Sequence, residues 1–130
     1  MSAPAVAIRT TDGRTVARDV EQALGFWGRF MGLMGRAALP AGEGLYLPDT
    51  SIHMFFMRFP IDALFVTDPD GNGRRRVVAV RPDLPPWRGI VMPVKGAKGV
   101  VELPAGTLAA ARVQPGDEVV FEPIGGAASS

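Results

Sequence analysis

The chain is 130 residues long, is 47% hydrophobic and carries a formal net charge of +1. This length fits one domain, and this charge lacks the basic excess of a general nucleic-acid binder. The absence of cysteine excludes disulfides and thiol nucleophiles, and the single histidine excludes a multi-histidine metal site within one chain, so no metal or cofactor is expected.

The sequence also predicts no membrane span. No stretch reaches the roughly 18 apolar residues of a spanning helix, and the first ten residues lack the features of a signal peptide. We therefore expect a cytoplasmic protein by default, or an exported one if a signal peptide has been removed.

The first 39 residues contain the predicted helices. Residues 1–18 are polar and hold a turn at Asp12-Gly13, which is typical of a frayed arm or an edge hairpin. Asp19 is a favourable N-cap, and apolar residues follow it with helical spacing. Four glycines interrupt this pattern, so we expect one or two short helices from residues 19–39. The apolar stripe is Val20, Ala23, Leu24, Trp27 and either Phe30 or Met31.

From Pro40 onward, short apolar runs alternate with turn residues, and Thr107–Arg112 fits one helical turn. Because no long crossover helix separates the runs, we expect antiparallel pairing. The predicted fold is mainly β (α+β at the margin), a small sandwich or distorted barrel. It forms a single domain over residues 1–130, with a core from about 17 to 122 and flexible ends at 1–5 and 125–130. The predicted strands are Leu45–Leu47, Ser51–Phe59, Ile61–Thr67, Arg75–Arg81, Ile90–Val94, Gly99–Leu103 and Glu118–Phe121.

Several motifs resemble those of the "domain of unknown function 192" family. They are RFMGLMGR at 29–36, LPAGEGL at 39–45, SIHMFFMRFPID at 51–62, PWR at 86–88, AKGVVELPAG at 97–106 and PGD at 115–117. The resemblance runs from about Ala17 to Glu122 and keeps the motifs in the expected order. It implies a compact, mainly-β domain of bacteria and archaea, and it implies no established activity.

His53 lies in the most apolar segment of the chain, Ser51–Asp62. An imidazole titrates near neutrality, which suits a general base or a ligand contact, whereas the alternative is a hydrogen-bonded core residue. For catalysis we favour the core interpretation, because no nucleophile is paired with His53. A triad of Ser51, His53 and Asp62 lacks a nucleophile elbow and an oxyanion loop. An enzyme would instead use His53 with Asp62 or Glu102.

Arg58 and Asp62 flank a Phe-Pro-Ile sequence, so we predict that both are buried with charge-assisted partners. The simplest interpretation is mutual pairing or carboxylate bonds to loop amides near Pro60. The functional alternative makes Arg58 an anchor for an anionic ligand. Glu102 stands in an apolar strand, either as an outward residue or as the carboxylate partner of an inner arginine.

Trp87 and Arg88 follow two prolines, which stiffen their loop and fix the indole in place. The ring is then either a ligand contact or a structural lid. We predict that His53 and Trp87 line one cleft near the Ser51–Asp62 hairpin, with Arg58 or Arg88 as the anion-binding group. This favours a non-catalytic module that binds a small anionic ligand or a peptide.

Two polar segments are also candidate functional sites. The Asp68–Gly73 segment is predicted to be a turn between antiparallel strands. It matches the first half of a calcium loop, but Ala79 stands where that loop needs glutamate, so a metal is not expected. The triplet Arg74–Arg76 is normally a solvated feature, and its functional alternative is regulatory nucleic-acid binding.

Overall fold

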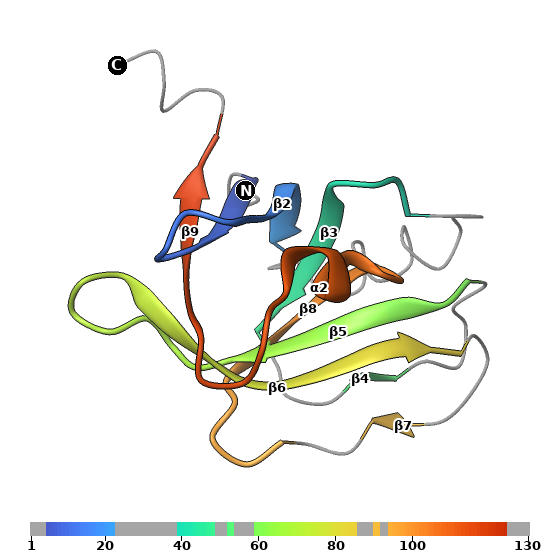
Figure 1. Ribbon diagram of the computed structural model, residues 1–130. Coiled ribbons are helices and arrows are strands. Elements are labelled where there is room, and N and C mark those ends of the chain that lie inside the picture. The colour runs from blue at the N-terminus through green and yellow to red at the C-terminus, as the bar shows by residue number, and fades with distance from the viewer. Residues whose placement is uncertain are drawn as a thin grey trace.

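Figure 1 shows a computed structural model of the chain, which describes residues 5–22, 39–48, 52–53, 59–85, 90–91 and 94–124. These residues form nine strands and one short helix. The elements are β1 (Val6–Thr10), β2 (Thr15–Gln22), β3 (Glu43–Leu47), β4 (Ile52–His53), β5 (Ile61–Val66), β6 (Arg74–Leu84), β7 (Ile90–Val91), β8 (Gly99–Pro104), α2 (Thr107–Ala111) and β9 (Glu118–Pro123).

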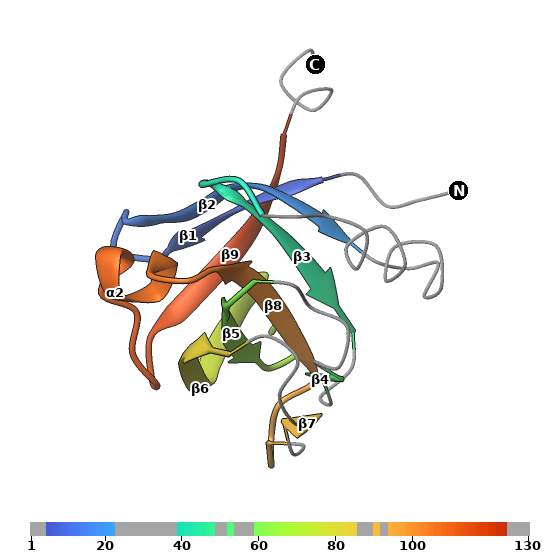
Figure 2. The ribbon, with the colours of Figure 1, turned by 90° about the vertical axis from the view of Figure 1, so that its right-hand side faces the viewer.

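Seven of the described strands close into a barrel in the order β1-β2-β3-β8-β5-β6-β9, and β1 pairs with β9 to complete the ring (Figure 2). Every ladder of the ring is antiparallel except β2–β3, which is parallel. The remaining two strands, β4 and β7, pair with each other as a separate sheet. The mainly-β prediction of a distorted barrel is confirmed.

The prediction of helices from residue 19 is wrong for residues 19–22, which are the end of β2. Asp19 is therefore not an N-cap but pairs with Glu43 of β3. The buried residues of β2 are Val16, Ala17 and Val20, because register shifts against β1 break the regular alternation of the strand. The predicted helical stripe begins at Val20 of β2, and its other members lie outside the described residues. Residues 23–38, the rest of the predicted helical region, lie outside the described residues.

The hairpin between β5 and β6 has the predicted form. β5 and β6 pair antiparallel, and the Asp68–Gly73 turn joins them. The Asp70 carboxylate accepts hydrogen bonds from the backbone N–H groups of Asn72 and Arg74, at 2.8 and 2.9 Å. Asp70 thus stabilises the turn itself, and no group of acidic or histidine side chains in the described residues is arranged to hold a metal.

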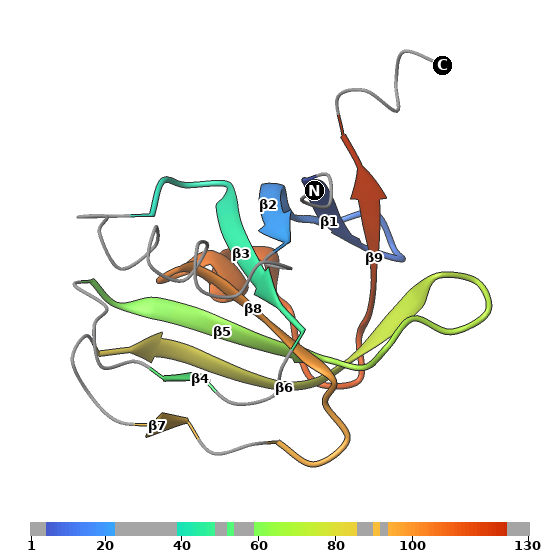
Figure 3. The same cartoon turned by 180° about the vertical axis from the view of Figure 1, so that it is seen from behind.

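The barrel wall separates two apolar clusters. The inner cluster fills the barrel, and Leu108 of α2 joins it, so the helix plugs one end of the barrel. The outer cluster lies on the other side of the wall, where Phe59 and Val94 also pack against it. Its buried members are Leu39, Leu45, Leu47, Ile61, Ala63, Phe65, Ala79, Ala97 and Val100. The β4–β7 sheet lies outside the barrel, below β5 and β6 in both Figure 1 and Figure 3.

Candidate functional site

Glu102 is a buried carboxyl on the outer face of the barrel wall. It sits in register between Leu45 of β3 and Ala63 of β5, and both of these neighbours belong to the outer cluster. Residues directly opposite each other in a ladder project to the same side, so the Glu102 side chain enters this apolar layer. It is 2% exposed, and within the described part of the chain its Oε1 atom has no hydrogen-bond partner.

Burial raises the pKa of Glu102 from 4.5 to about 7. A carboxyl in an apolar environment loses the hydration that stabilises its charged form, and this desolvation causes the shift. Glu102 is therefore divided between its neutral and charged forms near neutral pH. The sequence pattern placed it in an apolar strand, but the pattern did not show which face it occupies.

Asp62 faces the opposite way, into the barrel. It pairs in register with Leu103 of the inner cluster and is fully buried. Its two carboxylate oxygens accept hydrogen bonds from the N–H of Asp83, at 2.8 Å, and the N–H of Leu108, at 2.9 Å. Burial and charge-assisted pairing were predicted for Asp62 and are confirmed, although the donors are these two amides rather than amides near Pro60.

The two N–H groups that donate to Asp62 lie where regular secondary structure is interrupted or begins. Between Ile61 and Ala63 the register with β6 shifts, and Asp83 in this irregular stretch has a left-handed φ of 53°. Leu108 lies in the first turn of α2, where N–H groups lack partners within the helix. Asp62 satisfies both amides, so it ties α2 and the end of β6 to β5. Asp62 and Glu102 lie on opposite faces and cannot act together on one substrate.

The β4–β7 sheet carries His53. In this sheet His53 pairs with Ile90, which follows Trp87 and Arg88 by three and two residues in the sequence. Ser51, Arg58, Trp87 and Arg88 lie outside the described residues, so the cleft shared by His53 and Trp87 stays a prediction. On the outer side of the barrel, Val94, three residues after β7, packs against the outer cluster.

The Arg74–Arg76 triplet does not present one basic face. Arg75 turns toward the barrel, where its guanidinium stacks on the rings of Tyr46 and Phe121, with its Cζ 5.0 and 4.3 Å from their centroids. It also donates to the Tyr46 hydroxyl, at 3.1 Å. Arg76 pairs with Glu118 of β9 in the ladder. The cation–π contacts stabilise the junction of β6 and β9.

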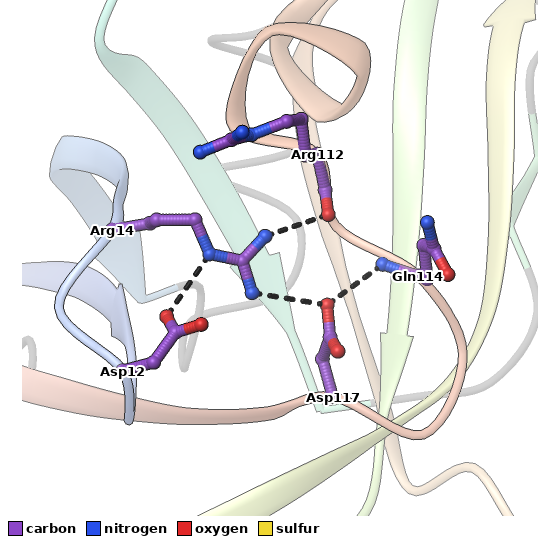
Figure 4. Close-up of a pocket in the computed structure, with 5 residues that line it drawn as sticks. All are labelled: Asp12, Arg14, Arg112, Gln114 and Asp117. Carbon is purple, nitrogen blue, oxygen red and sulfur yellow. Dashed lines mark hydrogen bonds and ion pairs between the residues drawn. The ribbon is translucent and has the colours of Figure 1, made fainter.

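A polar pocket of about 510 Å³ lies between two turns that are about 100 residues apart in the chain (Figure 4). Arg14 crosses it and donates hydrogen bonds to the backbone carbonyls of Ala111 and Arg112, at 2.9 and 2.7 Å. Its guanidinium also pairs with Asp12 and Asp117, at 3.0 and 3.4 Å. Arg14 therefore clamps the β1–β2 turn to the end of α2.

The hydrogen bonds of Arg14 also affect the pKa of Asp12. The hydrogen bond from the Arg14 side chain, followed by that from Thr10, lowers the pKa of Asp12 from 3.8 to about 2. The sequence predicts the turn at Asp12-Gly13 and contains the PGD motif at 115–117, but it does not show that these two segments meet. Because its donors are engaged by the protein itself, Arg14 is a structural group rather than a ligand site.

The fold and the site define a small closed β-barrel protein with a buried carboxyl on the outer face of its wall. Comparison with known proteins identifies the family. The chain belongs to the DUF192 family, described as "Uncharacterized ACR, COG1430", whose model matches residues 7–121. That description names no activity. In the described residues, no helix is both long and apolar enough to cross a membrane.

Relatives and solved structures agree with this assignment. A UPF0127 protein of Thermococcus sibiricus is 34% identical, over 88% of this chain and 73% of its own length, and one of Pyrococcus furiosus is 34% identical, over 86% and 94%. A Sinorhizobium meliloti structure named "putative transcription regulator" aligns with a TM-score of 0.71 and 26% identity, over 92% of this chain and 95% of that one. A Novosphingobium aromaticivorans protein of unknown function aligns with a TM-score of 0.69 and 26% identity, over 88% and 82%.

Proposed function

We propose that the protein is a non-catalytic binding module that takes a small ligand or a peptide on the outer side of the barrel, at Glu102. The observation that supports this proposal is the Glu102 carboxyl, embedded among apolar side chains with its Oε1 unpaired in the described residues. An unpaired buried carboxyl opposes folding. Such groups concentrate at functional sites, where a ligand supplies the missing partner.

The proposed site also includes the residues of the cleft that the sequence predicts. His53 is carried by the separate β4–β7 sheet, and Arg58, Trp87 and Arg88 are the ligand contacts that the sequence suggests. In this proposal the two arginines bind an acidic group of the ligand, and the indole packs against its apolar part. Because no barrel ladder includes β4 or β7, their displacement by a ligand would leave the barrel intact.

A second candidate is a small hydrolase-like enzyme that uses His53 with Glu102. The pKa of about 7 favours it, since a general acid or base works best when its pKa is near the working pH. Asp62 does not fit this role, because its carboxylate faces the barrel interior and is held by two amides. A regulatory nucleic-acid role is suggested by the name of the Sinorhizobium relative. It is not favoured, because the Arg75 side chain packs on Tyr46 and Phe121 and so does not contribute to a basic surface.

The test is a ligand screen by two-dimensional ¹H–¹⁵N NMR on the purified protein, using small metabolites and short peptides sorted by charge. The binding-module proposal expects saturable shifts of the β8 amides, with each compound recovered unchanged. Conversion of a compound to product in wild type, and not in His53→Ala, would replace the proposal with the enzyme. A complete screen without β8 shifts, or with hits that map elsewhere, would overturn it.

A further inference from the structure

Glu102 differs from the other buried carboxyl of the described residues in what surrounds it. Asp62 has two backbone N–H groups at hydrogen-bond distance. Glu102 instead has Leu45 and Ala63 beside it in the two flanking ladders, and neither side chain can donate a hydrogen bond. Its position therefore offers a negative charge or a hydrogen-bond acceptor that the described part of the fold leaves unused.

The charged groups on the neighbouring described strands do not neutralise Glu102. On β5 the adjacent carboxylate, Asp62, points to the other face of the wall. On β3, Glu43 is two residues before Leu45 and thus on the same side as Glu102, but it carries a like charge and has an interaction of its own. No arginine or lysine lies on β3, β5 or β8.

We propose that Glu102 is the receptor for a cationic nitrogen of the ligand, an ammonium or a guanidinium group. This inference rests on the proposed binding function and specifies its ligand class. A cation supplies both the charge and the N–H donors that the embedded carboxylate lacks, and in an apolar layer such a pair is bound more strongly than in water. An anionic group placed against Glu102 would be repelled, and a neutral donor would leave its charge unbalanced.

The apolar layer around Glu102 defines the rest of that ligand. Leu45, Ala63 and Val100 line the same side of the wall, so the cationic nitrogen must be carried by an alkyl chain or another apolar group. A peptide meets this requirement through a lysine or arginine side chain. The inference thus favours the peptide over a purely anionic small molecule.

The experiment uses three probes of equal length and different charge: butylammonium, butyrate and 1-butanol. Each is titrated into the ¹⁵N-labelled protein near pH 8, where Glu102 is ionised and an alkylamine is still charged. Butylammonium should give saturable shifts at Val101, Glu102 and Leu103, and the other two probes should not. In Glu102→Gln its dissociation constant should rise about tenfold or more, because the charge–charge attraction is lost. Glu118→Gln, which alters an exposed glutamate of β9, should bind like wild type.

Each remaining outcome counts against one specific claim. If butyrate or 1-butanol shifts these β8 amides and butylammonium does not, the cation inference falls while the binding module stands. If butylammonium binds Glu102→Gln as well as wild type, the carboxylate is not its receptor, and the inference is again wrong. If none of the probes binds, the inference is overturned, and the broader compound screen decides the binding function separately.

Discussion

Glu102→Gln should stabilise the protein, and the gain should depend on pH. Burial raises the pKa of Glu102 from 4.5 to about 7, and one pKa unit corresponds to about 1.4 kcal/mol. Ionising this carboxyl in the folded state therefore costs about 3 kcal/mol more than in the unfolded chain. Glutamine has nearly the same shape and no charge, so it avoids this cost.

The direction of this pH dependence follows from how tightly the folded and unfolded states bind the Glu102 proton. Between pH 4.5 and about 7 the folded protein holds the Glu102 proton more tightly than the unfolded chain does. The free energy of unfolding must therefore fall as pH rises through this range and level off above it. The difference between Glu102→Gln and wild type should accordingly be smallest near pH 4.5 and largest, by about 3 kcal/mol, above pH 7.

Urea denaturation of wild type and Glu102→Gln, measured at several pH values across this range, tests the reasoning. Other groups titrate as well, but they contribute equally to both proteins, so the difference isolates Glu102. Glu118→Gln is the matched control and should follow wild type at every pH, because Glu118 is exposed. A constant difference between Glu102→Gln and wild type across the range would refute the account of a buried, unpaired carboxyl.

Three further predictions concern the barrel itself. Asp62→Ala should lower the free energy of unfolding by about 3 kcal/mol, because it leaves the buried N–H of Leu108 and the partly buried N–H of Asp83 unpaired; urea denaturation measures this, and Asp83→Asn, which keeps the backbone donor, should have little effect. Gly99→Ala should lower the melting temperature strongly, since a Cβ would overlap the Tyr46 ring, whereas Gly71→Ala has free space and should not. In Arg14→Gln, an NMR titration should find the pKa of Asp12 above its value of about 2, because its main hydrogen-bond donor is lost. An unchanged Asp12 pKa would contradict the Arg14 clamp.

The strands that follow Pro40 were predictable because the sequence patterns that specify them lie within each strand and its adjoining turns. Alternating apolar runs bounded by Gly, Pro and Asp, such as the β5–β6 hairpin around Asp68–Gly73, specify their own pairing. The hairpin of β1 and β2 around Asp12-Gly13 agrees with the edge hairpin that was one of two alternatives for residues 1–18. The end of β2, at residues 19–22, was assigned to a helix because Val20 begins an apolar stripe with helical spacing. Closure of the barrel by β1 and β9 depends on residues that are more than 100 positions apart, which no local pattern encodes.

The candidate site was only partly predictable, for the same reason. The apolar context of Asp62 indicated burial and pairing, and both are found. The sequence could not separate Asp62 from Glu102 as a functional carboxyl, because that distinction depends on which face of the wall each occupies. The register of β8 with β3 and β5 decides it. It assigns Asp62 to the fold and leaves Glu102 as the buried carboxyl that lacks a described donor at Oε1.

The most direct measurement of the central claim is a ¹³C NMR titration of the Glu102 carboxyl, with and without saturating butylammonium. In the free protein the account predicts a pKa of about 7. With the cation bound, the ionised form is favoured, so the pKa should fall by about one unit or more. A Glu102 pKa near 4.5 in the free protein, or one that butylammonium leaves unchanged, would contradict the claim that this buried carboxyl is the binding group.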